Sequence, residues 1–417
     1  MNNDDDEEEY DIPVLNLCHP SIVNCMRNIA TELNLEYDTN LSEQAWNCLG
    51  CILGTNTSVT KLVIDNYDTY SLSNVSWLCD GLQYNQNIKK FKFDGIDLED
   101  AEKMKSLASF LSNNTSLREI TLSYCSVGQG GMNILANALM NRTADTLKTF
   151  FLDGNNLGDC NLDGLVTALS TCTRLTTLSL RENNIVQRGC TSLAHLLKNS
   201  ESNLEYLHLS DNAINDEGVG ILTDSLSNNT NLRRLSLSDF NKSGNRIRGS
   251  GWMSLLKLVC DTSSMTAVVE SNHTFGELHA PIISGKAETI SALGVDDANL
   301  LYVSLKLNKN CRSWTEVVRQ KMIWAHAARR GINIADADIP LDVMPVILSW
   351  FGDYLNEKNA KLIQYHTPPL SEEVVNTMRL DSLYRIVREM PDLCQSGQPS
   401  VDDVSELTDT LAHTSLA

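Results

Sequence analysis

The chain has 417 residues, of which 42% are hydrophobic, and its 33 basic and 53 acidic side chains give a formal net charge of −20 at pH 7. A phosphate backbone would be repelled by this acidic excess, which argues against nucleic acid as a partner. No apolar run reaches the roughly 18 residues that a membrane-spanning helix needs, so no membrane contact is expected.

The N-terminal residues 1–9 include the acidic run Asp4–Glu9 and predict a disordered segment. A secretory signal peptide begins with basic residues, so this start predicts a cytoplasmic protein, with the nucleus as the alternative. Twelve cysteines are too dilute in a chain of this length for a disulfide scaffold. A reducing compartment fits them.

Residues 10–58 are predicted to form an N-terminal cap. Cys48 and Cys51 form a CxxC, which is one mark of a zinc site, and three further candidate ligands lie upstream at Cys18, His19 and Cys25. The two cysteines alternate with Trp46 and Leu49, however, which favours a buried helix. We therefore predict no metal site.

Residues 59–278 repeat one pattern about eight times. Most steps between copies are 28 to 30 residues, and the last is 33 because "SDFNKSGNRI" contains five inserted residues. A fixed period of this length is the signature of a solenoid. The repeats begin at Val59, Ile88, Leu117, Leu147, Leu175, Leu204, Leu232 and Met265.

Each repeat has two halves with different periods. In "LEYLHLSDN", Leu207 and Leu209 alternate with His208, which is the pattern of a strand with one buried face. In "GVGILTDSLSNN", Leu222 and Leu226 follow helical spacing. Each repeat is therefore predicted to be a strand followed by a helix.

Strands that all run in one direction predict a parallel sheet covered by helices through right-handed crossovers. Helices are wider than strands, so the stack should bend with the strands inside. The predicted fold class is α/β: a right-handed β-α superhelix, or horseshoe, with a parallel sheet inside and helices outside.

Polar residues recur where the chain leaves each strand. A buried turn must pair its backbone groups, and an amide side chain can pair both N–H and C=O. We therefore predict an internal structural ladder of Cys125, Asn155, Asn183, Asn212 and Asn245.

The pattern LxxLxLxxNxI, as in "LTTLSLRENNI" and "LEYLHLSDNAI", resembles leucine-rich repeats of the ribonuclease-inhibitor type, which are also found in NOD-like receptors and the Ran GTPase-activating protein. The resemblance covers residues 59–278. It implies a horseshoe that binds proteins on its concave face or rim, usually without catalysis.

Side chains between the strand leucines should point away from the core into the concavity. Seven gaps of about 4.8 Å give an inner arc of roughly 34 Å, which suits a protein rather than a small molecule. Aromatic residues and arginine are enriched at binding hot spots, so Phe151, Arg181 and Tyr206 lead the candidates. The full set is Tyr124, Phe151, Arg181, Glu182, Tyr206, His208, Asp211, Arg234 and Asp239.

Three lysines, Lys61, Lys90 and Lys92, cluster at one end of the same face. They would steer an acidic partner or simply solvate the surface. Both interpretations remain open at this point.

The sequence contains little that supports a catalytic function. His208, Ser210 and Asp211 resemble pieces of a hydrolytic triad, but nothing nearby supplies an oxyanion hole or excludes water. The glycine cluster at Gly128 lacks the lysine of a P-loop. No catalytic residue, cofactor or small-molecule substrate is predicted.

Beyond the repeats, residues 279–295 are predicted to be a linker, 296–391 a helical region and 392–417 a disordered tail. Ser313 and Glu316 have the spacing of a helix-capping box, and Gly331 can end that helix. The helical region either closes the solenoid or docks a second partner.

We therefore expect a non-enzymatic scaffold that binds another protein in its concavity. The alternatives are a regulator of a small GTPase or a substrate receptor of a ubiquitin ligase. The acidic run precedes the repeats instead of following them, and no F-box is recognisable before Val59. These two features count against the first and the second alternative, respectively.

Overall fold

The computed structural model describes residues 20–35, 43–65, 75–158, 162–238, 244–263, 265–279, 293, 295–310, 317–318 and 321. These residues divide into two compact units. The first unit comprises Met1–Leu258 with Thr274–Ala292, and the second comprises Val259–His273 with Leu293–Ala417.

One parallel sheet of nine strands, in the order β1 to β9, runs through the first unit. The strands are β1 (Glu32–Leu35), β2 (Lys61–Asp65), β3 (Lys90–Asp94), β4 (Glu119–Ser123), β5 (Thr149–Phe151), β6 (Thr177–Ser179), β7 (Tyr206–His208), β8 (Arg234–Ser236) and β9 (Glu277–His279). Neighbours in sequence are also neighbours in the sheet, as a stack of repeats requires.

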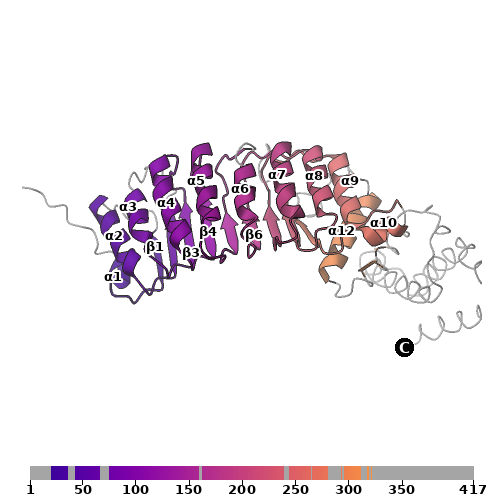
Figure 1. The fold of residues 1–417 in the computed structure, drawn as a ribbon. Coiled ribbons are helices and arrows are strands. Elements are labelled where there is room, and N and C mark those ends of the chain that lie inside the picture. The colour runs from indigo at the N-terminus through magenta and orange to yellow at the C-terminus, as the bar shows by residue number, and fades with distance from the viewer. Residues whose placement is uncertain are drawn as a thin grey trace, which may run out of the picture. The chain divides into compact units, whose positions relative to one another are not determined.

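Helices alternate with the strands and lie in one row along one side of the sheet (Figure 1). They are α1 (Pro20–Met26), α2 (Glu43–Thr55), α3 (Val75–Leu82), α4 (Ala101–Asn113), α5 (Gln129–Met140), α6 (Leu162–Leu169), α7 (Gln187–Lys198), α8 (Asp216–Leu226) and α9 (Gly249–Val259). The α/β solenoid predicted from the repeat period is confirmed.

The core lies between the strands and the helices. Leu207 of β7 is fully buried, while its strand neighbours Tyr206 and His208 are half-buried on the opposite face. From the helix side, Leu222 and Leu226 of α8 are buried as well. No single repeat can bury both of its apolar faces, so each depends on its neighbours.

The polar ladder continues through the turns after the strands. Asn155 Oδ1 accepts from the Cys125 N–H at 3.0 Å, and Asn183 Oδ1 accepts from the Asn155 N–H at 2.9 Å. Asn212 Oδ1 accepts from Asn183 N–H at 3.1 Å, and Asn245 donates to the Leu209 carbonyl at 3.0 Å. Each asparagine side chain thus forms a hydrogen bond with a backbone group of the preceding repeat.

A second ladder, which sequence reasoning missed, lies in the turns before the strands. Asn85 Nδ2 donates to the Leu53 carbonyl, and Asn114 Nδ2 donates to the Asn85 carbonyl at 2.7 Å. The signal was present, because an asparagine stands three residues before several repeat starts. These asparagines are Asn56, Asn85, Asn114 and Asn229.

Two predictions about the ends of the array are wrong. The strand expected at Met265 is instead helix α10 (Met265–Glu270), and the next strand, β9, begins at Glu277. Phe275 and Leu278 take the buried positions there. A short apolar run such as "MTAVVE" does not by itself distinguish strand from helix.

At the other end, β1 extends the sheet into the segment predicted as a cap. Leu33 and Leu35 pair in register with Leu62 and Ile64 of β2. The repeat was missed because its starting residue, Ala30, is small.

The second unit contains α10, α12 (Val295–Asn310) and the helical residues 317–318 and 321 among the described residues. Lys321 is fully buried there, and its ammonium group donates to the backbone carbonyls of Val259 and Asn272. Its Nζ also lies 2.9 Å from His273 Nδ1. The predicted N-terminus 1–9, tail 392–417, capping box at Ser313 and most of the linker lie outside the described residues.

Candidate functional site

The face of the sheet opposite the helices, here called the open face, carries rows of side chains in register. The first row is Glu32, Lys61, Lys90, Glu119, Thr149, Thr177, Tyr206, Arg234 and Glu277. The second is Asn34, Val63, Lys92, Thr121, Phe151, Ser179, His208, Ser236 and His279. Equivalent residues of successive repeats therefore lie side by side.

At the β1–β4 end, the lysines pair with carboxylates of neighbouring strands. Lys61 lies 2.9 Å from Glu32, and Lys90 lies 2.8 Å from Glu119. Because these charges are mutually neutralised, the three lysines present less positive potential than their number implies.

Lys92 is shared between Asp65, at 2.9 Å, and Asp94, at 3.1 Å. Burial alone would lower the pKa of Lys92, but its hydrogen bonds to Asp65 and Asp94 outweigh burial and raise it. The lysine therefore stays charged and bound within the face.

The centre of the open face, on β5 and β6, differs from this end because its strand side chains are uncharged. Phe151 is half-buried and projects between Thr121 of β4 and Ser179 of β6, which share its row. An aromatic ring among small hydroxyl side chains is accessible to an apolar group of a partner.

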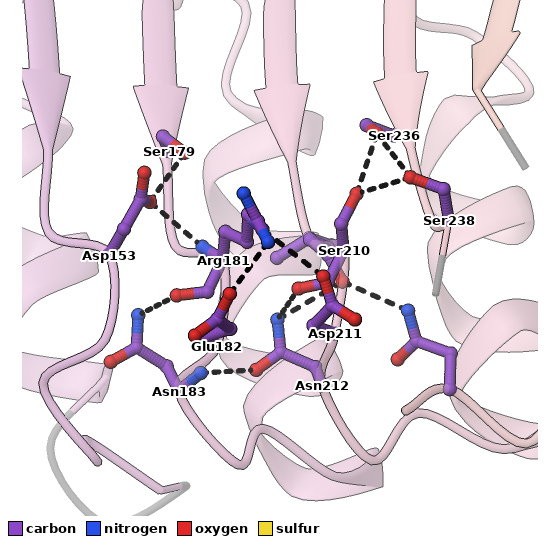
Figure 2. A network of polar contacts seen from close by, with 12 residues as sticks. Asp153, Ser179, Arg181, Glu182, Asn183, Ser210, Asp211, Asn212, Ser236 and Ser238 are labelled. Carbon is purple, nitrogen blue, oxygen red and sulfur yellow. Dashed lines mark hydrogen bonds and ion pairs between the residues drawn. The ribbon is translucent and has the colours of Figure 1, made fainter. Parts of the chain in front are cut away.

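A polar network begins just past these strands (Figure 2). The carboxylate of Asp153 accepts from the Ser179 hydroxyl and, at 3.0 Å, from the Arg181 N–H. Burial raises the pKa of Asp153, and these two hydrogen bonds act in the opposite direction. The carboxylate holds the chain at the end of β6 in place.

Arg181 lies at the centre of the network. Its Nη2 is 2.7 Å from Glu182 and its Nε is 3.1 Å from Asp211. The Asp211 side chain is only 2% exposed, whereas that of Arg181 is 37% exposed. Asp211 therefore positions the guanidinium, and Arg181 remains accessible to a partner.

Tyr124 joins this cluster from two repeats away. Its hydroxyl lies 3.1 Å from Glu182 Oε2, and 46% of the residue is exposed. Burial raises the pKa of the phenol, and the hydrogen bond to Glu182 adds to the shift, so the hydroxyl stays protonated as the donor. Tyr124, Arg181, Glu182 and Asp211, all selected from the sequence, form one group.

The backbone around this group is in the left-handed region. Tyr124, Glu182 and Asp211 have φ values of 52°, 55° and 54°, and Gly154 occupies the equivalent turn at 68°. A left-handed residue other than glycine costs roughly 1–2 kcal/mol. Gly154 is required for a further reason, since a Cβ there would lie 2.2 Å from the Tyr124 ring.

A second group lies at the β7–β9 end. Arg234 pairs with Glu277 and its guanidinium lies 4.9 Å from the centroid of the Tyr206 ring. Burial lowers the pKa of His208, and the charges of Arg234 and His279 lower it further. This favours a neutral imidazole beside the stacked arginine.

Ser210 is one of the three residues that resemble pieces of a hydrolytic triad in the sequence. Its hydroxyl lies 2.7 Å from that of Ser236 and 2.9 Å from that of Ser238 (Figure 2). These partners are hydroxyl groups, which cannot serve as the base that a serine nucleophile needs.

Of the predicted contact residues, Asp239 alone lies outside the described residues. Within the described part of the chain, no three or more His, Cys, Asp or Glu side chains gather to hold a metal ion. None of the helices described is both long and apolar enough to cross a bilayer.

The expectation that Cys48 and Cys51 lie in the core is wrong, because both are exposed on α2. The buried residues of that helix are Ala45, Trp46, Leu49, Gly50 and Leu53. Both cysteines lie outside this stripe.

No family model matches the chain. It is 28% identical over 240 residues to NACHT, LRR and PYD domains-containing protein 3 of Bos taurus, covering 56% of the chain and 22% of that protein. It is 29% identical over 178 residues to the ribonuclease inhibitor of Sus scrofa, covering 36% of the chain and 39% of the inhibitor. The chain thus spans well under half of these relatives.

Among solved structures, the chain matches the leucine-rich repeat-containing protein LegL7 from Legionella pneumophila. It is 13% identical, with a TM-score of 0.40, and the match covers 70% of this chain and 89% of LegL7.

Proposed function

We propose that the chain, whose repeats are similar to those of the ribonuclease inhibitor and of NACHT, LRR and PYD domains-containing protein 3, is a non-enzymatic leucine-rich-repeat scaffold that binds another protein on the open face of its sheet. The supporting observation is the arrangement of Tyr124, Phe151 and Arg181 beside the Tyr206–Arg234 stack on one continuous surface.

Preorganisation supports this proposal. Arg181 is held by Glu182 and Asp211, and Arg234 is held by Glu277 and Tyr206. An arginine that is already fixed loses less side-chain entropy on binding than a free one. Both guanidinium groups are therefore held in place on the open face before a partner arrives.

The size of the surface points to a macromolecule. Nine strands at about 4.8 Å spacing extend the open face over roughly 38 Å, comparable to a small domain. One relative is named as an inhibitor of ribonuclease, which is itself a protein. A protein partner fits both observations.

Affinity capture with matched variants tests the proposal. The purified chain would capture partners from a cell extract, alongside the triple variant Phe151→Ala, Arg181→Ala, Tyr206→Ala. The control triple, Trp77→Ala, Tyr84→Ala, Arg188→Ala, removes the same kinds of side chain from exposed positions on or beside the helices.

We expect the open-face variant to lose the main captured protein at least tenfold, while the control retains it. Equal recovery with both variants, or loss with the control alone, would reject the open face as the binding surface. Circular dichroism of each variant confirms that the fold is intact.

A further inference from the structure

Two cysteines on α2, Cys48 and Cys51, differ from every other cysteine in the described residues because both are exposed. Burial raises the pKa of Cys25 to about 11 and that of Cys125 to about 12, which keeps these thiols protonated. The thiolate is the reactive form and it must be reachable. The other buried members of the described set are Cys79, Cys172, Cys190 and Cys260.

The spacing of the exposed pair suits chemistry between its two sulfurs. Residues three apart on a helix face the same side, with Cβ atoms about 5–6 Å apart. A disulfide needs Cβ atoms about 3.8 Å apart, so closure requires one helical turn to tighten. Gly50, a residue with no side chain, lies inside that turn.

A metal site is the weaker interpretation. A structural zinc ion takes four protein ligands, and the pair supplies two. No third His, Cys, Asp or Glu joins them among the residues the structure describes. Thiol–disulfide exchange, in contrast, needs only two neighbouring sulfurs.

We propose that Cys48 and Cys51 are a reversible redox pair that exchanges with small disulfides such as oxidised glutathione. One thiolate attacks the disulfide, forms a mixed disulfide and releases one glutathione thiolate. The second cysteine, as thiolate, then attacks the protein sulfur of the mixed disulfide and displaces the second glutathione. In total, two protein thiols and one oxidised glutathione become one protein disulfide and two reduced glutathiones.

The helix packing makes this disulfide a labile one. α2 lies so close to α3 at Gly50 that a Cβ there would be 2.8 Å from the Trp77 carbonyl oxygen. Tightening the turn that contains Gly50 therefore disturbs the contact between α2 and α3. Strained disulfides are reduced easily, so the pair would respond to redox conditions instead of staying oxidised.

Thiol mapping of the full chain tests the proposal. The protein is equilibrated with glutathione buffers of increasing oxidised fraction, blocked with iodoacetamide before and after unfolding, and analysed by peptide mass spectrometry. We expect the peptide with Cys48 and Cys51 to lose both alkylatable thiols as an internal disulfide before Cys79 or Cys125 reacts. In Cys51→Ser, glutathione should accumulate on Cys48, which traps the intermediate.

Thermal unfolding supplies the second readout. Oxidation should lower the midpoint of the native chain and leave that of Cys48→Ser, Cys51→Ser unchanged, because the variant cannot close the turn. Glutathione on both cysteines without an internal disulfide would overturn the proposal. So would buried cysteines that react first, or oxidation that leaves the native midpoint unmoved.

Discussion

At the scale of single residues, the turn after β5 shows how closely the site and the fold are connected. Gly154 permits the left-handed turn and leaves room for the Tyr124 ring, which in turn reaches Glu182. A side chain at this position should therefore lower the stability of the fold and displace the Tyr124 ring.

Gly154→Ala should lower the free energy of unfolding by about 2–3 kcal/mol, since it adds a steric clash to the cost of a positive φ. Gly158→Ala is the matched control: its φ is 59° but a Cβ there meets nothing within 4 Å, so only about 1 kcal/mol should be lost. Urea unfolding of the two variants measures the difference. Equal losses would mean that the ring contact contributes nothing.

The asparagine ladder supplies a second residue-scale prediction. Asn183 is fully buried; it donates to the Leu152 and Arg181 carbonyls and accepts from the Asn155 N–H. Asn183→Ala leaves several buried groups unpaired and should cost at least about 2 kcal/mol. Asn203→Ala, which removes one exposed hydrogen bond to Thr173, should cost less than about 1 kcal/mol in the same unfolding assay.

The sequence could place residues on the open face but not their partners. The repeat period shows that Phe151 and Tyr206 lie next to buried apolar residues, here Phe150, Leu152 and Leu207. It does not show that Tyr124 reaches Glu182, 58 residues away, because that contact depends on how a side chain crosses two turns. The pairing of Lys90 with Glu119 could have been predicted from the sequence, since both occupy the same position of adjacent repeats.

At the scale of elements, α2 and α3 pack through glycine. A Cβ on Gly81 would lie 2.1 Å from the backbone carbon of Gly50. Gly81→Ala should therefore force the helices apart and lower the free energy of unfolding by about 1–3 kcal/mol.

The control for this prediction is Gly220→Ala in α8, where a Cβ meets nothing within 4 Å. Alanine favours a helix interior over glycine, so this variant should be stabilised by up to about 1 kcal/mol. A Gly81→Ala variant that gained stability as well would contradict the close packing.

Lys321 predicts a pH dependence in the second unit. Burial lowers its pKa from the ordinary 10.5 to about 7, while the nearby Cys260 acts in the opposite direction. Between pH 7 and 10.5 the unfolded chain holds this proton and the folded chain has released it. Stability should therefore rise with pH across this window, by at most about 1.4 kcal/mol per unit.

The measurement compares unfolding at several pH values for the native chain, Lys321→Met and the exposed control Lys306→Met. Other groups titrate in this range, so the difference between native and variant is the relevant quantity. The increase in stability with pH should be absent in Lys321→Met and present in Lys306→Met. A native slope retained in Lys321→Met would assign the pH dependence to other groups.

The elements in the middle of the array were predictable and those at its ends were not. Because the period recurs from Val59 to Leu232, the strand and helix positions of each repeat can be predicted even where one residue departs from the pattern. At β9 the period does not recur, since α9 and α10 intervene and the spacing from Leu232 to the buried Phe275 is much longer than one repeat. α2 shows a related limit, because helical spacing indicated an apolar stripe but left the exposed side of Cys48 and Cys51 unresolved.

At the scale of the first unit, the repeats convert local pairing into one extended surface. Several charges of this surface are paired within the chain, as in the Lys61–Glu32 and Arg234–Glu277 pairs. Aromatic rings and fixed arginines therefore distinguish the β5–β8 part of the face from the rest. This is the part that we expect a partner to cover.

Hydroxyl-radical footprinting of the chain, alone and with the captured partner, tests this central claim most directly. Oxidation of Tyr124, Phe151 and Tyr206 should fall several-fold in the complex, while Trp77 and Tyr84, exposed at α3, should react as before. Protection of Trp77 and Tyr84 with undiminished oxidation of the open-face aromatics would contradict the account.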